Sequence, residues 1–204
     1  MKIYELAPTP SAKRVSFFLA EKGIDVERES INVREGENLT EAFQALSVNG
    51  RIPVLELDDG TTICESIAIC RYFEELYPEK AALFGETALE KAQIEMWQRI
   101  VELQGLFVAF QAFRNITAIY SDRETCIEAW GQESRQRVID FVPTLEKQLA
   151  SNEYIAGDKY SVADITAFVL MGMLAALEVA TDDYPNLQAW KSRIAERPAI
   201  QSMS

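Results

Sequence analysis

The stretch Asn49-Gly50-Arg51-Ile52-Pro53-Val54-Leu55-Glu56-Leu57-Asp58-Asp59-Gly60, followed four residues later by Glu65-Ser66, decides the fold. The apolar residues of Val54–Leu57 have the composition of a buried strand. Pro53 stands at the first position of this strand, where a missing backbone N–H is tolerated. Because Asp58-Asp59-Gly60 is a turn signal, Thr61–Ile63 is predicted to return as the second strand of a hairpin.

The two ends of this stretch also carry features that suit a ligand. A proline that enters a buried strand after a glycine-containing turn is a candidate cis peptide bond. Such a bond would expose the backbone N–H and C=O of Ile52 at the sheet edge, where an extended peptide can pair as an added strand. Glu65-Ser66 opens an amphipathic helix, whose first N–H groups and Ser66 hydroxyl can bind a carboxylate. The stretch therefore fits a small anionic peptide, and equally a plain hairpin followed by a capped helix.

These residues resemble a known signature. Ile52-Pro53-Val54-Leu55 with Glu65-Ser66 is similar to the glutathione-site motif of the cytosolic glutathione transferases. The family pattern before the proline is Asn-Pro-x-Gly-(Lys or Gln)-Val-Pro, and Leu46–Pro53 keeps the glycine and the proline but lacks the leading Asn-Pro. The resemblance covers essentially the whole chain and is nearest to a bacterial branch allied to the Nu class and to similar fungal enzymes.

A second motif of the same family lies far along the chain. Ala156-Gly157-Asp158 is followed by Ser161-x-x-Asp164. In this pattern Ser161 and Asp164 form a capping box, in which each side chain bonds to the backbone N–H of the other residue. The role of this motif is in folding and not in chemistry.

Composition limits the classes of function. The chain has 204 residues, 48% of them apolar and 25% charged, which is typical of a globular protein with one large or two small domains. The net charge of −12 argues against a nucleic-acid partner. The chain contains no histidine, which excludes an imidazole base. Its three cysteines form no C-x-x-C motif, so no metal site is predicted. We expect a cytoplasmic protein, because the chain begins directly in a strand with no secretion signal.

The order of predicted elements divides the chain in two. Residues 1–80 predict β-α-β-α-β-β-α, an α/β domain with a mixed sheet that matches the thioredoxin-like, glutathione-binding domain of the resembled family. The strands and helices before the hairpin are predicted at Lys2–Leu6, Ser11–Gly23, Val26–Val33 and Leu39–Leu46.

The run to Gly85 is a linker, and residues 86–204 show only helical periodicity, which predicts an all-α domain. Within it, Cys126–Leu149 is expected to be a long helix kinked or broken at Pro143. The apolar helix that ends at Leu177 is too short to span a bilayer, so no membrane partner is expected.

The chemistry that the resemblance implies is attack of the glutathione sulfur on an electrophile. A free thiol has a pKa of ~8.5, so the site must favour the thiolate through hydrogen-bond donors or the positive end of a helix. The resemblance places this donor at the start of the first helix, where we assign Ser11 as the catalytic residue with Thr9 as the alternative. Pro10 holds the position of the catalytic serine of many members and has no donor. Backbone N–H groups or an ordered water stay open as donors, and Ser11 could instead serve only as an N-cap.

The remaining site residues follow from the resemblance by position. Ile52 would pair through its backbone with the cysteinyl unit of glutathione. Glu65 would bind the γ-glutamyl ammonium and Ser66 its carboxylate, while Arg51 would meet the glycyl carboxylate. Asn38 would replace a histidine of the branch. The glutathione-binding set is thus Ser11, Asn38, Arg51, Ile52, Glu65 and Ser66, of which Asn38 and Arg51 can equally be ordinary solvated loop residues.

The electrophile site is expected between the domains. Phe107, Phe110, Phe113 and Tyr120 are candidates for its lining. An aromatic stripe at helical spacing is usually core, so only Phe113 and Tyr120 are retained.

The sequence therefore predicts a glutathione transferase, or a closely allied glutathione peroxidase, that detoxifies a small hydrophobic electrophile. Glutathione is the co-substrate, no further cofactor is expected, and the resemblance implies a homodimer with Arg71, Trp97 and Arg99 as interface candidates. One alternative is a non-catalytic glutathione-binding or regulatory protein of the same fold, which Pro10 favours. Another is a glutathione-dependent reductase or isomerase, although a reductase usually needs a cysteine in residues 8–16, and none is present. The sequence does not name the electrophile.

Overall fold

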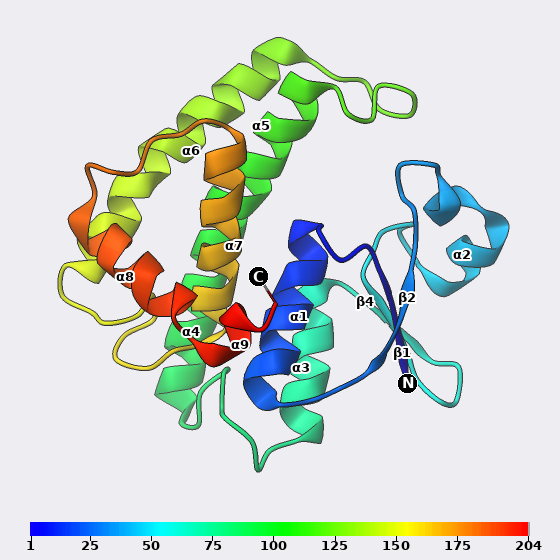
Figure 1. The fold of residues 1–204 in the computed structure, drawn as a ribbon, viewed down its shortest axis with the longest axis horizontal. Helices are drawn as coiled ribbons and strands as arrows, with labels where there is room; N and C mark the ends of the chain where they lie inside the picture. The colour runs from blue at the N-terminus through cyan, green and yellow to red at the C-terminus, as the bar shows by residue number, and fades with distance from the viewer. Residues whose placement is uncertain (204) are drawn as a thin grey trace. The chain divides into compact units, whose positions relative to one another are not determined.

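The computed structural model describes residues 1–203, which form two compact units, residues 1–81 and residues 82–202, with Met203 grouped with the first (Figure 1). The N-terminal unit comprises β1 (Lys2–Glu5), α1 (Pro10–Lys22), β2 (Glu27–Ser30), the 3-10 turn η1 (Glu37–Leu39), α2 (Glu41–Leu46), β3 (Val54–Glu56), β4 (Thr62–Cys64) and α3 (Ser66–Leu76). The second unit is helical throughout its regular structure. It comprises α4 (Ala88–Ile100), the π-helical segment η2 (Val101–Leu106), α5 (Phe107–Thr117), α6 (Glu128–Leu149), α7 (Val162–Ala176), α8 (Pro185–Ala195) and α9 (Pro198–Gln201). The predicted fold class, an α/β unit followed by an all-helical one, is confirmed.

The sheet of the N-terminal unit is four-stranded and mixed, in the order β2-β1-β3-β4. β1 pairs in parallel with β2 and antiparallel with β3, and β3 pairs antiparallel with β4 as the predicted hairpin. Successive residues of a strand face opposite sides of a sheet. Tyr4 and Val54 accordingly pack with Phe43 of α2 in one apolar cluster, and their neighbours Ile3 and Leu55 are fully buried.

Helices α1 and α3 pack against each other, side by side in Figure 1. Their contact combines completely buried apolar side chains, Phe18 of α1 with Ile69 and Phe73 of α3, and a buried ion pair of 2.7 Å between Lys22 and Glu74. The sequence at the end of α1 explains where it stops, because Gly23 adopts the left-handed conformation that suits glycine at a helix C-terminus. The amphipathic pattern predicted for both helices therefore accounts for their packing against each other.

Two predicted elements differ from the structure. The second strand is shorter than Val26–Val33, because only Glu27–Ser30 pairs with β1. All four of its residues are exposed, as expected of an edge strand that carries charged side chains. Of the kink or break predicted at Pro143, the break does not occur, because α6 runs continuously from Glu128 to Leu149. Val142 and Leu145 beside the proline are buried, so packing holds the helix together despite one missing backbone hydrogen bond.

The helical unit is built around α7, most of whose residues are buried. The π-helical segment η2 joins α4 to α5 and contacts α7. Gly105 of η2 lies so close to α7 that an added Cβ would sit 2.6 Å from Leu170 Cδ2. Across residues 1–203, none of the helices combines the length and the apolar character that crossing a membrane requires.

Two helical glycines give a matched pair of stability predictions. A Cβ on Gly131 of α6 would lie 2.8 Å from Ile116 Cγ1 and 2.9 Å from the Ile116 backbone nitrogen. Gly131→Ala is therefore expected to lower the free energy of unfolding by about 1 to 3 kcal/mol through overpacking. A Cβ on the exposed Gly172 of α7 would meet no atom within 4 Å. Gly172→Ala is therefore expected to raise the free energy of unfolding by about 0.5 to 1 kcal/mol. Urea denaturation of both variants tests this, and equal stability of the two would contradict the packing argument.

Candidate functional site

The register of the strands brings the predicted site residues to one edge of the N-terminal sheet. Tyr4 at the C-terminal end of β1 pairs with Val54 at the start of β3, and Val54 pairs with Cys64 at the end of β4. The chain leaving β1 leads into α1, the chain entering β3 is Ile52-Pro53, and the chain leaving β4 is Glu65-Ser66. Residues from three distant parts of the sequence therefore meet at this edge.

At the start of α1, Ser11 and Thr9 have different surroundings. Thr9 is the N-cap, Pro10 is the first helical residue and Ser11 is the second, so Ser11 is not itself the N-cap. The Thr9 hydroxyl donates to the Leu6 carbonyl at 2.8 Å, which engages its proton. The Ser11 hydroxyl is half-buried and, within residues 1–203, has no hydrogen-bond partner. Of the two hydroxyls, the geometry thus leaves the Ser11 donor available for a ligand.

The backbone at the start of α1 offers further groups, besides the Ser11 hydroxyl, that can stabilise an anion. Pro10 carries no N–H, so the Ser11 N–H is the first unpaired backbone donor of the helix. The first turn of α1 contains no acidic side chain to balance the positive end of the helix dipole. A thiolate placed here would be stabilised by the hydroxyl, the N–H and the dipole together.

The entry into β3 presents an unpaired backbone edge. The Ile52–Pro53 peptide bond is cis, which confirms that expectation. Neither the N–H nor the C=O of the half-buried Ile52 forms a hydrogen bond with another group in the described part of the chain. Both are free to pair with an extended peptide in the way that a sheet edge accepts an added strand.

A hydrogen-bonded turn supports this edge from the preceding side. The buried Ser47 hydroxyl accepts from the Arg51 N–H at 3.0 Å and donates to the Arg51 carbonyl at 2.9 Å. The Asn38 side-chain amide donates to the Gly50 carbonyl at 2.7 Å. Asn38 therefore belongs to the turn, while its side-chain oxygen stays buried and unpartnered in residues 1–203. The Arg51 side chain is exposed and forms no ion pair within those residues, so it is free to meet a carboxylate.

Glu65 and Ser66 lie at the start of α3. Ser66 is the first helical residue and is only 2% exposed, and its hydroxyl has no hydrogen-bond partner among the described residues. Glu65 occupies the N-cap position with φ of 71°, a value that few residues with a side chain adopt. Its exposed carboxylate accepts a hydrogen bond of 2.9 Å from the Asn49 side chain. Backbone strain of this kind is often found at binding sites.

Asn49 is a site residue that the sequence analysis missed. Its amide nitrogen donates to Glu65, and its side-chain oxygen accepts from the Arg51 N–H at 3.1 Å. Asn49 thereby connects the turn before β3 to the start of α3. No sequence pattern signals this link, because the two partners are 16 residues apart and meet only through the hairpin.

The candidates for the electrophile site lie in the helical unit. Phe113 of α5 and Tyr120 are both half-buried. The Tyr120 ring contacts two guanidinium groups, with Arg114 at 4.7 Å and Arg123 at 5.6 Å from its centroid. These cation–π contacts hold the ring of Tyr120 in place.

Cys70 of α3 can be excluded as a nucleophile. It is completely buried, and burial raises the pKa of its thiol far above the ordinary value. Because the thiolate is the reactive form, this cysteine is inert. Cys70 therefore takes no part in chemistry at this site as a thiolate.

Comparisons with known proteins agree with this geometry. Residues 9–76 match the family model of the glutathione S-transferase N-terminal domain, and residues 110–198 match that of the glutathione S-transferase C-terminal domain. Glutathione S-transferase 2 of Saccharomyces cerevisiae is 33% identical over 215 residues, which cover 100% of this chain and 89% of the yeast protein. A Gtt2-class glutathione S-transferase structure from Vibrio parahaemolyticus is 52% identical with a TM-score of 0.89, and the match covers 100% of this chain and 96% of that one. The structure of Gtt2 from Saccharomyces cerevisiae is 30% identical with a TM-score of 0.92, and the match covers 100% of both chains.

Proposed function

The chain belongs to the glutathione S-transferase family, and from this premise we propose that it binds glutathione at the edge of the N-terminal sheet, stabilises the thiolate with Ser11 and adds it to a small hydrophobic electrophile. The observation that carries the proposal is the meeting of three unpaired sets of groups at this edge. They are the Ser11 hydroxyl, the Ile52 backbone and, at the start of α3 beside Glu65, the Ser66 hydroxyl. A tripeptide with a central thiol and charged ends is complementary to all three.

Each part of glutathione has a partner in this arrangement. The cysteinyl backbone pairs with the N–H and C=O of Ile52. The γ-glutamyl carboxylate binds the Ser66 hydroxyl and the first N–H groups of α3, and its ammonium binds Glu65. The glycyl carboxylate meets Arg51. Asn38 acts by holding the Gly50 carbonyl, which positions the turn that contains Arg51.

The catalytic step is addition of the glutathione sulfur to an electrophilic carbon. Ser11 lowers the pKa of the bound thiol by donating a hydrogen bond to the sulfur, so that more of the thiol is ionised at neutral pH. The thiolate then attacks the electrophile, and the leaving group or carbanion takes the negative charge. The reaction uses no cofactor besides the co-substrate glutathione. The electrophile is small and apolar, and Phe113 and Tyr120 are its proposed contacts.

The decisive experiment is the pKa of the bound glutathione thiol, measured by thiolate absorbance against pH in the wild type, Ser11→Ala and Thr9→Val. We expect a clearly lowered pKa in the wild type and a rise of about one unit in Ser11→Ala, equivalent to ~1.4 kcal/mol. Thr9→Val is the matched control, because the Thr9 hydroxyl already donates to Leu6. If the pKa of the bound thiol is lowered equally in the wild type and in Ser11→Ala, the donor is instead the backbone of α1 or a water.

The alternative function is that of a non-catalytic glutathione-binding protein of the same family. Pro10, which offers no donor at the usual serine position, favours this alternative. It predicts that glutathione binds with an unaltered thiol pKa and that a panel of electrophiles gives no conjugate. The same thiol titration therefore separates the two functions.

We also propose that the protein is a cytoplasmic homodimer. Apolar side chains are exposed along one continuous run of helix, at Leu89, Met96, Leu103 and Phe107. Exposed apolar surface of this kind is typical of an interface, and Arg71, Trp97 and Arg99 are its further proposed members. Sedimentation equilibrium is expected to give twice the chain mass of 23.0 kDa. A mass equal to one chain at micromolar concentration would contradict the dimer.

A further inference from the structure

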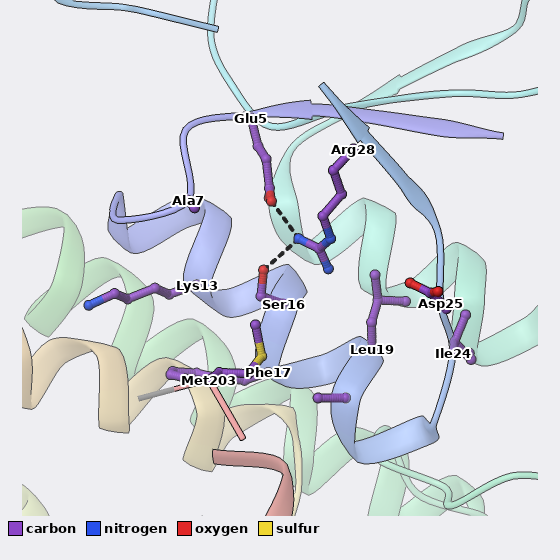
Figure 2. Close-up of a pocket in the computed structure, with 11 residues that line it drawn as sticks. Glu5, Ala7, Lys13, Ser16, Phe17, Leu19, Ile24, Asp25, Arg28 and Met203 are labelled. Atoms are coloured by element: carbon purple, nitrogen blue, oxygen red, sulfur yellow. Dashed lines mark hydrogen bonds and ion pairs between the residues drawn. The ribbon is translucent and has the colours of Figure 1, made fainter. Parts of the chain in front are cut away.

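We infer that a groove beside α1 is a second binding site, for a free α-amino acid with an apolar side chain. The groove has a volume of about 400 Å³, within the range of roughly 300 to 1,000 Å³ of small-molecule sites. It is lined by residues of β1, α1, the segment that leads into β2 and β2 itself, together with Ala7 and Met203 (Figure 2). None of its lining residues belongs to the proposed glutathione site, so the inference goes beyond the proposed function.

The central feature of the groove is a fixed arginine. One terminal nitrogen of Arg28 donates to the Ser16 hydroxyl at 2.7 Å and forms an ion pair with Glu5. Glu5 and Ser16 are only 4% and 5% exposed, so two buried partners hold the guanidinium. The other two nitrogens of Arg28 have no partner in residues 1–203. This leaves one edge of the guanidinium fork free for a carboxylate.

Charged groups of both signs stand along the groove. Figure 2 shows Lys13 and Asp25 on opposite sides of the cluster formed by Glu5, Ser16 and Arg28. Both Lys13 and Asp25 are exposed, and neither forms an ion pair in the described part of the chain. The second carboxylate oxygen of Glu5 is buried at this wall without a hydrogen-bond partner among the same residues. The groove therefore carries the Arg28–Glu5 ion pair, with one guanidinium edge still free, and two further charged side chains, Lys13 and Asp25.

The balance of charge selects the ligand. Because Glu5 and Arg28 already neutralise each other, a monocarboxylate would leave Asp25 uncompensated, and an amine would leave the free edge of the Arg28 guanidinium unused. A zwitterion satisfies both, with its carboxylate at the free edge of Arg28 and its ammonium toward Asp25, while the Lys13 ammonium points away from this cluster (Figure 2). The remaining surface is apolar, and its residues are Ala7, Phe17, Leu19, Ala20, Ile24 and Met203. An amino acid with an aliphatic side chain matches the charges and the apolar wall together.

The test is calorimetric titration of the full chain with L-leucine, 4-methylpentanoate and 3-methylbutylamine. The second compound is leucine without its ammonium, and the third is leucine without its carboxylate. We expect leucine to bind and each truncated compound to bind about tenfold more weakly or worse, since each loses a charged contact. No binding of leucine up to millimolar concentration, or equal binding of all three compounds, would overturn the inference.

Three variants locate the site without removing buried partners. Lys13→Gln, at a side chain that points away from the cluster, is expected to change none of the three affinities, whereas Arg28→Lys is expected to weaken leucine and 4-methylpentanoate and to leave the amine unaffected. The lysine keeps a cation beside Glu5 but loses the fork. Asp25→Asn is expected to weaken leucine and the amine only. Lys91→Gln in α4 is the matched exposed control.

A last comparison separates this groove from the glutathione site. Ser66→Ala is expected to leave leucine binding unchanged, and saturating glutathione is expected not to displace leucine. Loss of leucine binding under either condition would show that leucine occupies the glutathione site, and the inference would then be wrong. Because the readout is leucine affinity, failure of the proposed transferase activity would not affect it.

Discussion

Replacing Asp164 by alanine is expected to lower the free energy of unfolding by about 3 to 5 kcal/mol, the range typical of breaking a buried charged network. The Asp164 carboxylate accepts the backbone N–H of Ile155 at 2.9 Å and the indole N–H of Trp190 at 2.9 Å. It also accepts the backbone N–H of Ser161 at 2.9 Å and the Ser161 hydroxyl at 3.1 Å. Asp164, Ile155, Ser161 and Trp190 are all 0% exposed, so water cannot replace the lost acceptor.

Urea denaturation measures this loss, with Asp158→Ala as the control because Asp158 is exposed in the same segment. Asp158→Ala is expected to change stability by less than about 0.5 kcal/mol. The pKa of bound glutathione should be the same in Asp164→Ala as in the wild type under conditions where the variant is folded. A melting temperature equal to that of the wild type would show that the network does not stabilise the helical unit.

The same carboxyl gives a pH dependence. Burial raises the pKa of Asp164 to about 6, while its hydrogen bonds act in the opposite direction. The unfolded value is ~3.9, so between about pH 4 and pH 6 the folded state binds more protons than the unfolded state. The contribution of this group to stability is therefore full below about pH 4 and declines as the pH rises to about 6. The stability difference between the wild type and the non-titrating Asp164→Asn variant should shrink over this interval, and a difference independent of pH would contradict the raised pKa.

Replacing Ser66 or Glu65 by alanine is expected to weaken glutathione binding by about 10- to 100-fold. Each substitution removes a hydrogen bond or ion pair to the charged γ-glutamyl end of glutathione. Such bonds contribute about 1.5 to 3 kcal/mol to the binding free energy. The Ser66 hydroxyl has no protein partner in the described residues, so its removal leaves no unpaired group behind. Glu65→Ala also removes the acceptor of the Asn49 amide.

Titration calorimetry with glutathione measures both affinities. Glu65→Gln separates the two roles of this residue, because the amide can still accept from Asn49 but cannot neutralise an ammonium. It is expected to bind as weakly as Glu65→Ala. Ser30→Ala on the exposed strand β2 is the matched serine control, with unchanged affinity. If both Glu65→Ala and Ser66→Ala bound glutathione like the wild type, the glutathione site would have to be placed elsewhere.

The sequence by itself determined the features that depend on short stretches. The hairpin follows from an apolar run, a proline at its first position and a turn three residues long. The capping of α7 follows from Ser161 and Asp164, because a capping box needs only two side chains at a fixed spacing of three residues. The division into an α/β unit and a helical unit likewise follows from hydrophobic periods that each element carries within itself.

Only the tertiary structure decided which groups are free and which are engaged. The sequence left Thr9 and Ser11 open as thiol donors, and the fold directs the Thr9 hydroxyl to Leu6 while leaving that of Ser11 unpartnered within residues 1–203. The link from Asn49 to Glu65 and the ion pair from Arg28 to Glu5 join residues 16 and 23 positions apart. Such contacts depend on strand register and helix packing, which involve many residues at once, and a local pattern carries no information about them. Packing also kept α6 continuous through Pro143, where a break is one of the two outcomes that the local rule predicts.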